Sequence, residues 1–111
     1  MISVIDYDGG NYKSVINILK RSKINYILTN DKTEILNSNK IILPGVSNFS
    51  YCIKRLKHLD LDKILSEAVL DNKKKILGIC SGMQILGTYS EEGDVEGLNF
   101  VNGTVKKIES D

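Results

Sequence analysis

Four short runs rich in Ile, Leu and Val, separated by more polar stretches, constrain the fold more than any other feature of this sequence. They lie at residues 2–5, 26–28, 41–43 and 76–79. Each is too short for a typical helix and apolar on both faces, which is typical of a strand buried in a parallel sheet. The sequence therefore predicts parallel strands that are covered on both sides.

The stretches between these runs carry apolar residues at helical spacing. A weaker helical turn is expected over residues 31–36, and Asn11 and Asp60 are placed to cap their helices. Strands that alternate with helices predict right-handed crossovers and an α/β fold, a doubly wound, mostly parallel sheet. The helical positions, with i, i+3, i+4, i+7 spacing, are Tyr12, Val15, Ile16 and Leu19; Phe49, Cys52, Ile53 and Leu56; and Leu61, Ile64, Leu65 and Ala68.

The composition suits one globular domain and argues against several classes of partner. The chain has 111 residues, of which 41% are hydrophobic and 26% charged, so a packed core is expected and disorder is not. Its formal charge of +1 offers no basic surface for nucleic acid or an anionic membrane. With two cysteines, one histidine and no apolar leader or membrane span, we expect a cytoplasmic protein without a disulfide, a metal or another cofactor.

The segment at residues 76–84 is the most informative for function. It reads I-L-G-I-C-S-G-M-Q, a strand that passes through G-x-C-x-G into the start of a helix. On such a turn the nucleophile projects from the end of the strand, and glycines on either side let strand and helix approach. Cys80 is therefore predicted to attack a carbonyl group as a thiolate, with the Ser81 amide as one oxyanion donor. A merely buried Cys80 would not account for both glycines, whereas Cys52, on an apolar helix face, is predicted to be core.

A second turn is predicted to border the same crevice. Residues 41–47 read I-I-L-P-G-V-S, a strand that leaves through Pro-Gly, and in open parallel sheets ligands bind beyond the carboxyl ends of the strands. Gly45 permits an unusual torsion that would let the Val46 amide serve as the other oxyanion donor; without the cysteine turn, an ordinary strand-to-helix turn would be the better interpretation. The first loop, residues 6–11, lacks a phosphate-binding motif, and its aspartates would repel phosphate.

Four segments together match a known family. They are I-D-Y-D-G-G-N in the first loop, I-L-P-G-V-S-N-F at the third strand, L-G-I-C-S-G-M-Q-I-L at the cysteine turn and S-E-E-G-D-V-E-G-L-N-F-V-N-G-T-V near the end. On these segments the chain resembles the glutamine amidotransferase subunits of imidazole glycerol phosphate synthase, within the class I glutamine amidotransferases. The resemblance implies a flavodoxin-like sheet that is incomplete at the carboxyl end, with residues 1–111 forming only the amino-terminal part of the domain. It also implies hydrolysis of glutamine to glutamate and ammonia, which passes to a cyclase subunit, a (β/α)8 barrel, in histidine biosynthesis.

The resemblance also implies roles for individual residues. Cys80 matches the nucleophile, Val46 and Ser81 match the backbone oxyanion donors, and Asn11 matches an asparagine beside the active site. Gly45 matches the glycine that lets the loop reorient, whereas a serine replaces a second glycine there and would stiffen the loop. The substrate-binding positions that the resemblance implies are Gly45, Ser47, Gln84 and Glu92.

Departures from the family pattern lead to three further expectations. The family's histidine base and its orienting acid form an H-x-E motif, which this sequence does not contain, so the chain alone is expected to be nearly inactive. Changes in the first loop and at Ser81 are also compatible with a relative that supplies ammonia for amidation of bacterial surface sugars. A third interpretation is a non-catalytic fragment that only binds a partner.

Overall fold

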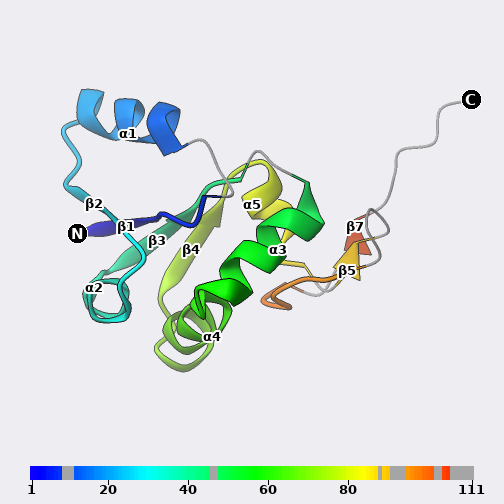
Figure 1. Ribbon diagram of the computed structural model, residues 1–111. Coiled ribbons are helices and arrows are strands. Elements are labelled where there is room, and N and C mark those ends of the chain that lie inside the picture. Colours follow the sequence, from blue (N-terminus) through cyan, green and yellow to red (C-terminus); the bar gives the residue numbers. More distant parts are fainter. Residues whose placement is uncertain (9–11, 46–47, 88, 91–94, 102–103, 106–111) are drawn as a thin grey trace, which may run out of the picture.

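A parallel sheet of four strands, in the order β2-β1-β3-β4, forms the centre of the molecule (Figure 1). The computed structural model describes residues 1–8, 12–45, 48–87, 89–90, 95–101 and 104–105. All the pairings in this sheet are parallel, which confirms the predicted α/β fold. The strands span Ile2–Ile5 (β1), Tyr26–Thr29 (β2), Lys40–Leu43 (β3) and Lys75–Gly78 (β4).

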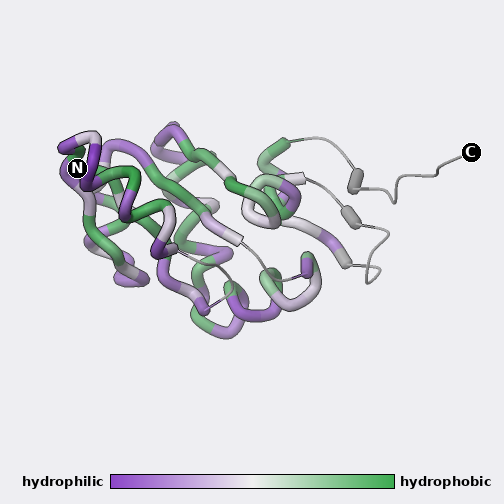
Figure 2. Tube along the Cα trace, turned by 90° about the horizontal axis from the view of Figure 1, so that it is seen from above, coloured by the Kyte–Doolittle hydropathy of each residue, from purple (hydrophilic) through white to green (hydrophobic). Residues whose placement is uncertain are grey.

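Helices cover both faces of the sheet, as the alternating pattern predicted. On one face α1 packs Val15 and Leu19 against Val4 and Ile42, and on the other face the helices between β2 and β4 pack against the apolar cluster of Ile5. Successive strand residues point to opposite faces, so Val4 and Ile5 serve different clusters. In Figure 2 hydrophobic and hydrophilic stretches alternate along the trace. The helices are α1 (Tyr12–Arg21), α2 (Lys32–Asn37), α3 (Phe49–His58), α4 (Leu61–Ser66) and the π-helical segment η1 (Glu67–Asp71).

The predicted apolar helix faces are confirmed, but one predicted cap is wrong. Asp31 accepts a hydrogen bond from the Glu34 amide at 3.0 Å and begins α2, and the Asn48 side chain accepts one from the Tyr51 amide at 2.8 Å and begins α3. Asp60 precedes α4, yet its side chain makes no cap hydrogen bond. Its φ of 57° is left-handed, whereas a capping side chain needs an extended backbone to reach the following amides.

A separate small sheet follows the main one, with the order β6-β5-β7. β5 pairs antiparallel with β6 and parallel with β7. Figure 1 places β5 and β7 beyond α3, at the opposite end of the molecule from α1. The strands span Tyr89–Ser90 (β5), Val95–Glu96 (β6) and Thr104–Val105 (β7).

β4 is less buried than its apolar sequence predicted. Leu77 is 58% exposed, although its register neighbour Ile42 is buried. Among the described strands β4 pairs only with β3, so it forms one edge of the four-stranded sheet. The row Leu28, Val4, Ile42 and Leu77 crosses one face of the sheet, and α1 covers it only in part. The expectation of a strand buried on both faces therefore fails at Leu77.

Candidate active site

Cys80 occupies the sharp turn between β4 and α5 (Ser81–Gln84). Its side chain is exposed, and its backbone has φ 55° and ψ −122°. A residue with a side chain rarely adopts such a positive φ, and holding it there costs on the order of 1–3 kcal/mol. This backbone conformation exposes the thiol at the carboxyl end of β4, as in a nucleophile elbow. Residues 78–82 form this elbow.

Two glycines make the elbow sterically possible. A Cβ atom on Gly78 would lie 2.5 Å from the Met83 Cα, and one on Gly82 would lie 1.9 Å from the Leu43 carbonyl oxygen. Both distances are far below van der Waals contact, so no other residue fits without a backbone shift. Gly78 therefore lets α5 approach β4, and Gly82 lets it approach the end of β3.

The Pro44 turn, which follows β3 and of which Pro44 and Gly45 are described, lies directly against the elbow. The Ile79 amide donates to the Leu43 carbonyl at 3.0 Å, and the Ser81 amide donates to the Gly45 carbonyl at 3.1 Å. A Cβ atom on Gly45 would lie 2.5 Å from the Gly82 nitrogen. The structure thus brings the two turns singled out in the sequence into contact, with the Ser81 amide engaged by Gly45.

The remaining predicted site residues divide into described and undescribed ones. Gln84 ends α5 and is half-buried, and its amide donates to the Cys80 carbonyl at 3.3 Å. Four residues lie outside the described residues, so their predicted roles stay predictions: Asn11, Val46, Ser47 and Glu92.

Sequence reasoning missed Tyr7. This side chain is 1% exposed, and its hydroxyl donates a hydrogen bond to the Pro44 carbonyl. Burial raises the pKa of Tyr7 well above its ordinary value, and the neighbouring Cys52 side chain acts in the same direction. Cys52 itself is fully buried, which confirms its prediction as core. Tyr7 belongs to the first-loop motif, but no local pattern signals a contact 37 residues away.

Other candidate groups lie outside the elbow. His58 is exposed and ends α3, about 14 Å along the helix from its first residue. A cavity of about 440 Å³ is lined by α3, α4 and η1 residues with Gly97 and Leu98, and by no residue of the elbow. The described residues contain no group of three or more His, Cys, Asp or Glu side chains placed to hold a metal ion. No helix in the described part of the chain is long and apolar enough to cross a bilayer.

Comparison with known proteins relates this arrangement to glutamine-using enzymes. The family model of the CobB/CobQ-like glutamine amidotransferase domain matches residues 2–108. The imidazole glycerol phosphate synthase subunit HisH of Leptospira borgpetersenii is 38% identical over 111 residues, which are 100% of this chain and 54% of the relative. The HisH 2 subunit of Methanococcus maripaludis is 42% identical over 97% of this chain and 54% of its own length. The HisH subunit of Bacillus cereus strain ATCC 14579 is 46% identical over 97% and 52%. The chain spans about half the length of these curated relatives.

Proposed function

Because the chain belongs to the CobB/CobQ-like glutamine amidotransferase domain family, we propose that Cys80 is the nucleophile of an enzyme that hydrolyses glutamine to glutamate and ammonia. The observation that carries this proposal is the exposed Cys80 side chain at a positive φ, between two glycines that a larger residue could replace only with a backbone shift. A cysteine that only packs in the core is buried and needs no strained backbone, so neither feature is expected of a structural cysteine. The chain would form the amino-terminal part of the amidotransferase domain.

In the proposed reaction the Cys80 thiolate attacks the side-chain amide carbon of glutamine. A carbon–sulfur bond forms, and the carbonyl electron pair moves to oxygen to give a tetrahedral oxyanion. The oxyanion collapses as the amide nitrogen, protonated by a general acid, leaves as ammonia. Water then attacks the resulting thioester and releases glutamate and the thiolate. The proton carrier would be the histidine of the H-x-E motif that the family resemblance implies.

The oxyanion would be held by the backbone amides of Ser81 and Val46. The Ser81 amide donates to the Gly45 carbonyl at 3.1 Å, and that carbonyl belongs to the same peptide unit as the Val46 N–H. We therefore propose that rotation of the Gly45–Val46 peptide releases the Ser81 amide and presents the Val46 N–H to the oxyanion. Gly45 suits this rotation because it tolerates either sign of φ, whereas Ser47, in place of a second glycine, would slow it.

The glutamine itself would lie beyond the carboxyl ends of β3 and β4. Gln84 and Glu92 are proposed to hold its polar groups, with the loop at Gly45 and Ser47 against its side chain and Asn11 nearby. Supporting this placement, ligands in open parallel sheets bind outside the carboxyl ends of the strands. Gln84 also belongs to the short helix that the elbow starts.

The acceptor of the ammonia is proposed from the relatives' names. Each is a subunit of imidazole glycerol phosphate synthase, so we propose that the complete protein pairs with a cyclase subunit, a (β/α)8 barrel, in histidine biosynthesis. Amidation of surface sugars, a role as a non-catalytic partner-binding fragment and a cytoplasmic location stay predictions from the sequence. Neighbouring reading frames would distinguish the two acceptors, because a cyclase frame favours the first and a sugar synthetase frame the second.

Covalent labelling tests the nucleophile. We expect a chloromethyl ketone analogue of glutamine, in which a chloromethyl group replaces the amide nitrogen, to label Cys80 and leave the buried Cys52 unlabelled. Mass spectrometry of the digested protein locates the adduct. Glutamine should slow the labelling and asparagine should not. Cys80→Ser should abolish the adduct, and Cys52→Ser is the matched control that should retain it. Equal labelling of both thiols, or labelling that glutamine does not slow, contradicts the proposal.

A further inference from the structure

Three successive carbonyl groups, from the last residue of β3 into the Pro44 turn, each accept a hydrogen bond from a different donor. The Leu43 carbonyl accepts from the Ile79 amide and the Gly45 carbonyl accepts from the Ser81 amide, and both donors belong to the elbow. The carbonyl between them, that of Pro44, accepts from the side chain of Tyr7 instead. All three carbonyl groups that lead from the sheet into the Pro44 turn are therefore hydrogen-bonded. Two accept from backbone amides, and the middle one accepts from a single side chain.

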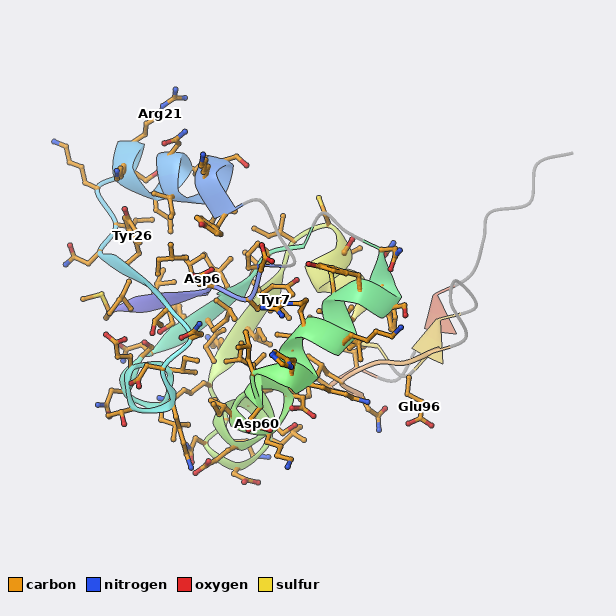
Figure 3. All side chains as sticks on the ribbon, in the orientation of Figure 1. Asp6, Tyr7, Arg21, Tyr26, Asp60 and Glu96 are labelled. Carbon is orange, nitrogen blue, oxygen red and sulfur yellow. The ribbon has the colours of Figure 1, made fainter. Side chains whose placement is uncertain are left out.

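Tyr7 is itself held rigidly. Its ring is 1% exposed and belongs to the same apolar cluster as Phe49 and Cys52 of α3. The Arg55 side chain of α3 donates from Nε to the Tyr7 carbonyl at 3.3 Å. Figure 3 shows Tyr7 just beyond the end of β1, alongside α3. A hydroxyl on so confined a ring has little freedom to follow a moving partner, so it fixes the Pro44 carbonyl in place.

We infer that Tyr7 is a positioning residue for the oxyanion hole: its hydroxyl holds the Pro44–Gly45 peptide still while the Gly45–Val46 peptide rotates. Loss of the hydroxyl would leave the Pro44 carbonyl without its buried partner, and the turn would move as a whole instead of at one peptide bond. The Val46 amide would then reach the oxyanion less often. The inference rests on the proposed function, because it concerns the same oxyanion.

The test compares Tyr7→Phe, which removes only the hydroxyl, with the unaltered chain. With the chloromethyl ketone, sulfur adds to the carbonyl carbon to give an oxyanion. The sulfur then displaces chloride from the chloromethyl carbon, while its bond to the carbonyl carbon breaks and the carbonyl re-forms, which leaves a thioether. We expect the maximal rate of Cys80 labelling to fall about tenfold. The ketone concentration that gives half this rate should not change, because Tyr7 is not proposed to touch glutamine. Labelling by iodoacetamide, which forms no oxyanion, should also keep its rate.

Tyr51→Phe is the matched control. The Tyr51 hydroxyl is also close to the first loop, at 3.5 Å from an Asp8 carboxylate oxygen, but it makes no contact with the Pro44 carbonyl in the described hydrogen bonds. This variant should label at the unaltered rate with both reagents. Thermal unfolding of all the variants, followed by circular dichroism, checks that each remains folded.

Hydrogen exchange supplies a second readout that needs no glutamine analogue. In Tyr7→Phe the Ser81 amide should exchange faster, because its acceptor at Gly45 is less well fixed, while the Ile79 amide, which donates to β3, should not change. Unchanged ketone labelling and unchanged Ser81 exchange would overturn the inference. An equal fall in ketone and iodoacetamide labelling would also overturn it, because it would mean that the elbow is generally disturbed. Failure of the unaltered chain to label at Cys80 would reject the proposed function, and the exchange result would still decide whether Tyr7 holds the turn.

Discussion

At the scale of single residues, the backbone conformation at Cys80 lowers the stability of the fold while it leaves the thiol exposed. Its positive φ is unfavourable for any side chain and favourable for glycine. We therefore expect Cys80→Gly to unfold at a higher denaturant concentration than Cys80→Ala, with a free energy of unfolding about 1 kcal/mol higher. Both variants lack the thiol, so their difference isolates the backbone. Equal stability of the two variants would mean that the elbow is not strained.

Tyr7 gives a residue-scale prediction about pH. Burial raises the pKa of Tyr7 above its ordinary value, so the folded state keeps a proton that the unfolded state loses near pH 10. The free energy of unfolding should consequently fall as the pH rises through about 10, and Tyr7→Phe should fall less steeply over the same range. Urea unfolding at several pH values, followed by circular dichroism, measures both slopes. Parallel slopes for the two proteins would contradict the raised pKa.

At the scale of elements, the residue that precedes α3 and the residue that precedes α4 should respond differently to substitution. Asn48→Ala removes a 2.8 Å cap bond to the Tyr51 amide at the start of α3 and should lower the free energy of unfolding by about 1 kcal/mol. Asp60→Gly removes no cap bond and relieves a left-handed φ of 57°, so it should leave stability unchanged or slightly raised. Chemical denaturation compares them; a larger loss from Asp60→Gly would show that Asp60 stabilises α4 after all.

The sequence predicted well those features that depend on contacts between residues close together in the chain or at the end of a neighbouring strand. G-x-C-x-G at residues 78–82 identified the elbow because the glycines are required by contacts within a few residues and at the end of β3. The cap at Asp60 was mispredicted because the left-handed φ there is set by the connection between α3 and α4, which residue type alone does not encode. Tyr7 was missed because its hydroxyl partner is 37 residues away.

At the scale of the whole molecule, the exposure of an apolar strand residue depends on whether a helix packs over it. Leu77 continues the apolar row of Val4 and Ile42, yet it is 58% exposed because α1 does not extend over it. Residue type predicts that a strand is apolar, but coverage depends on the positions of whole helices. The same reasoning applies to the site, where the contact between the elbow and the Pro44 turn follows from the parallel pairing of β3 and β4.

Residues 1–111 as one polypeptide should react only slowly with glutamine at Cys80 and should not turn over. In the proposed mechanism both the release of ammonia and the hydrolysis of the thioester need a proton carrier, and the single histidine of the sequence is His58. His58 ends α3, about 14 Å along the helix from the end next to the Pro44 turn, so we do not expect it to serve the thiol. Steady glutamate release should therefore be several orders of magnitude below that of a complete triad enzyme, although the chloromethyl ketone labels Cys80. A coupled glutamate assay measures the release, with Cys80→Ser as the control for contaminating glutaminase and His58→Ala expected to behave like the unaltered chain. Sustained turnover that His58→Ala abolishes would place the base on α3 and contradict the proposed site.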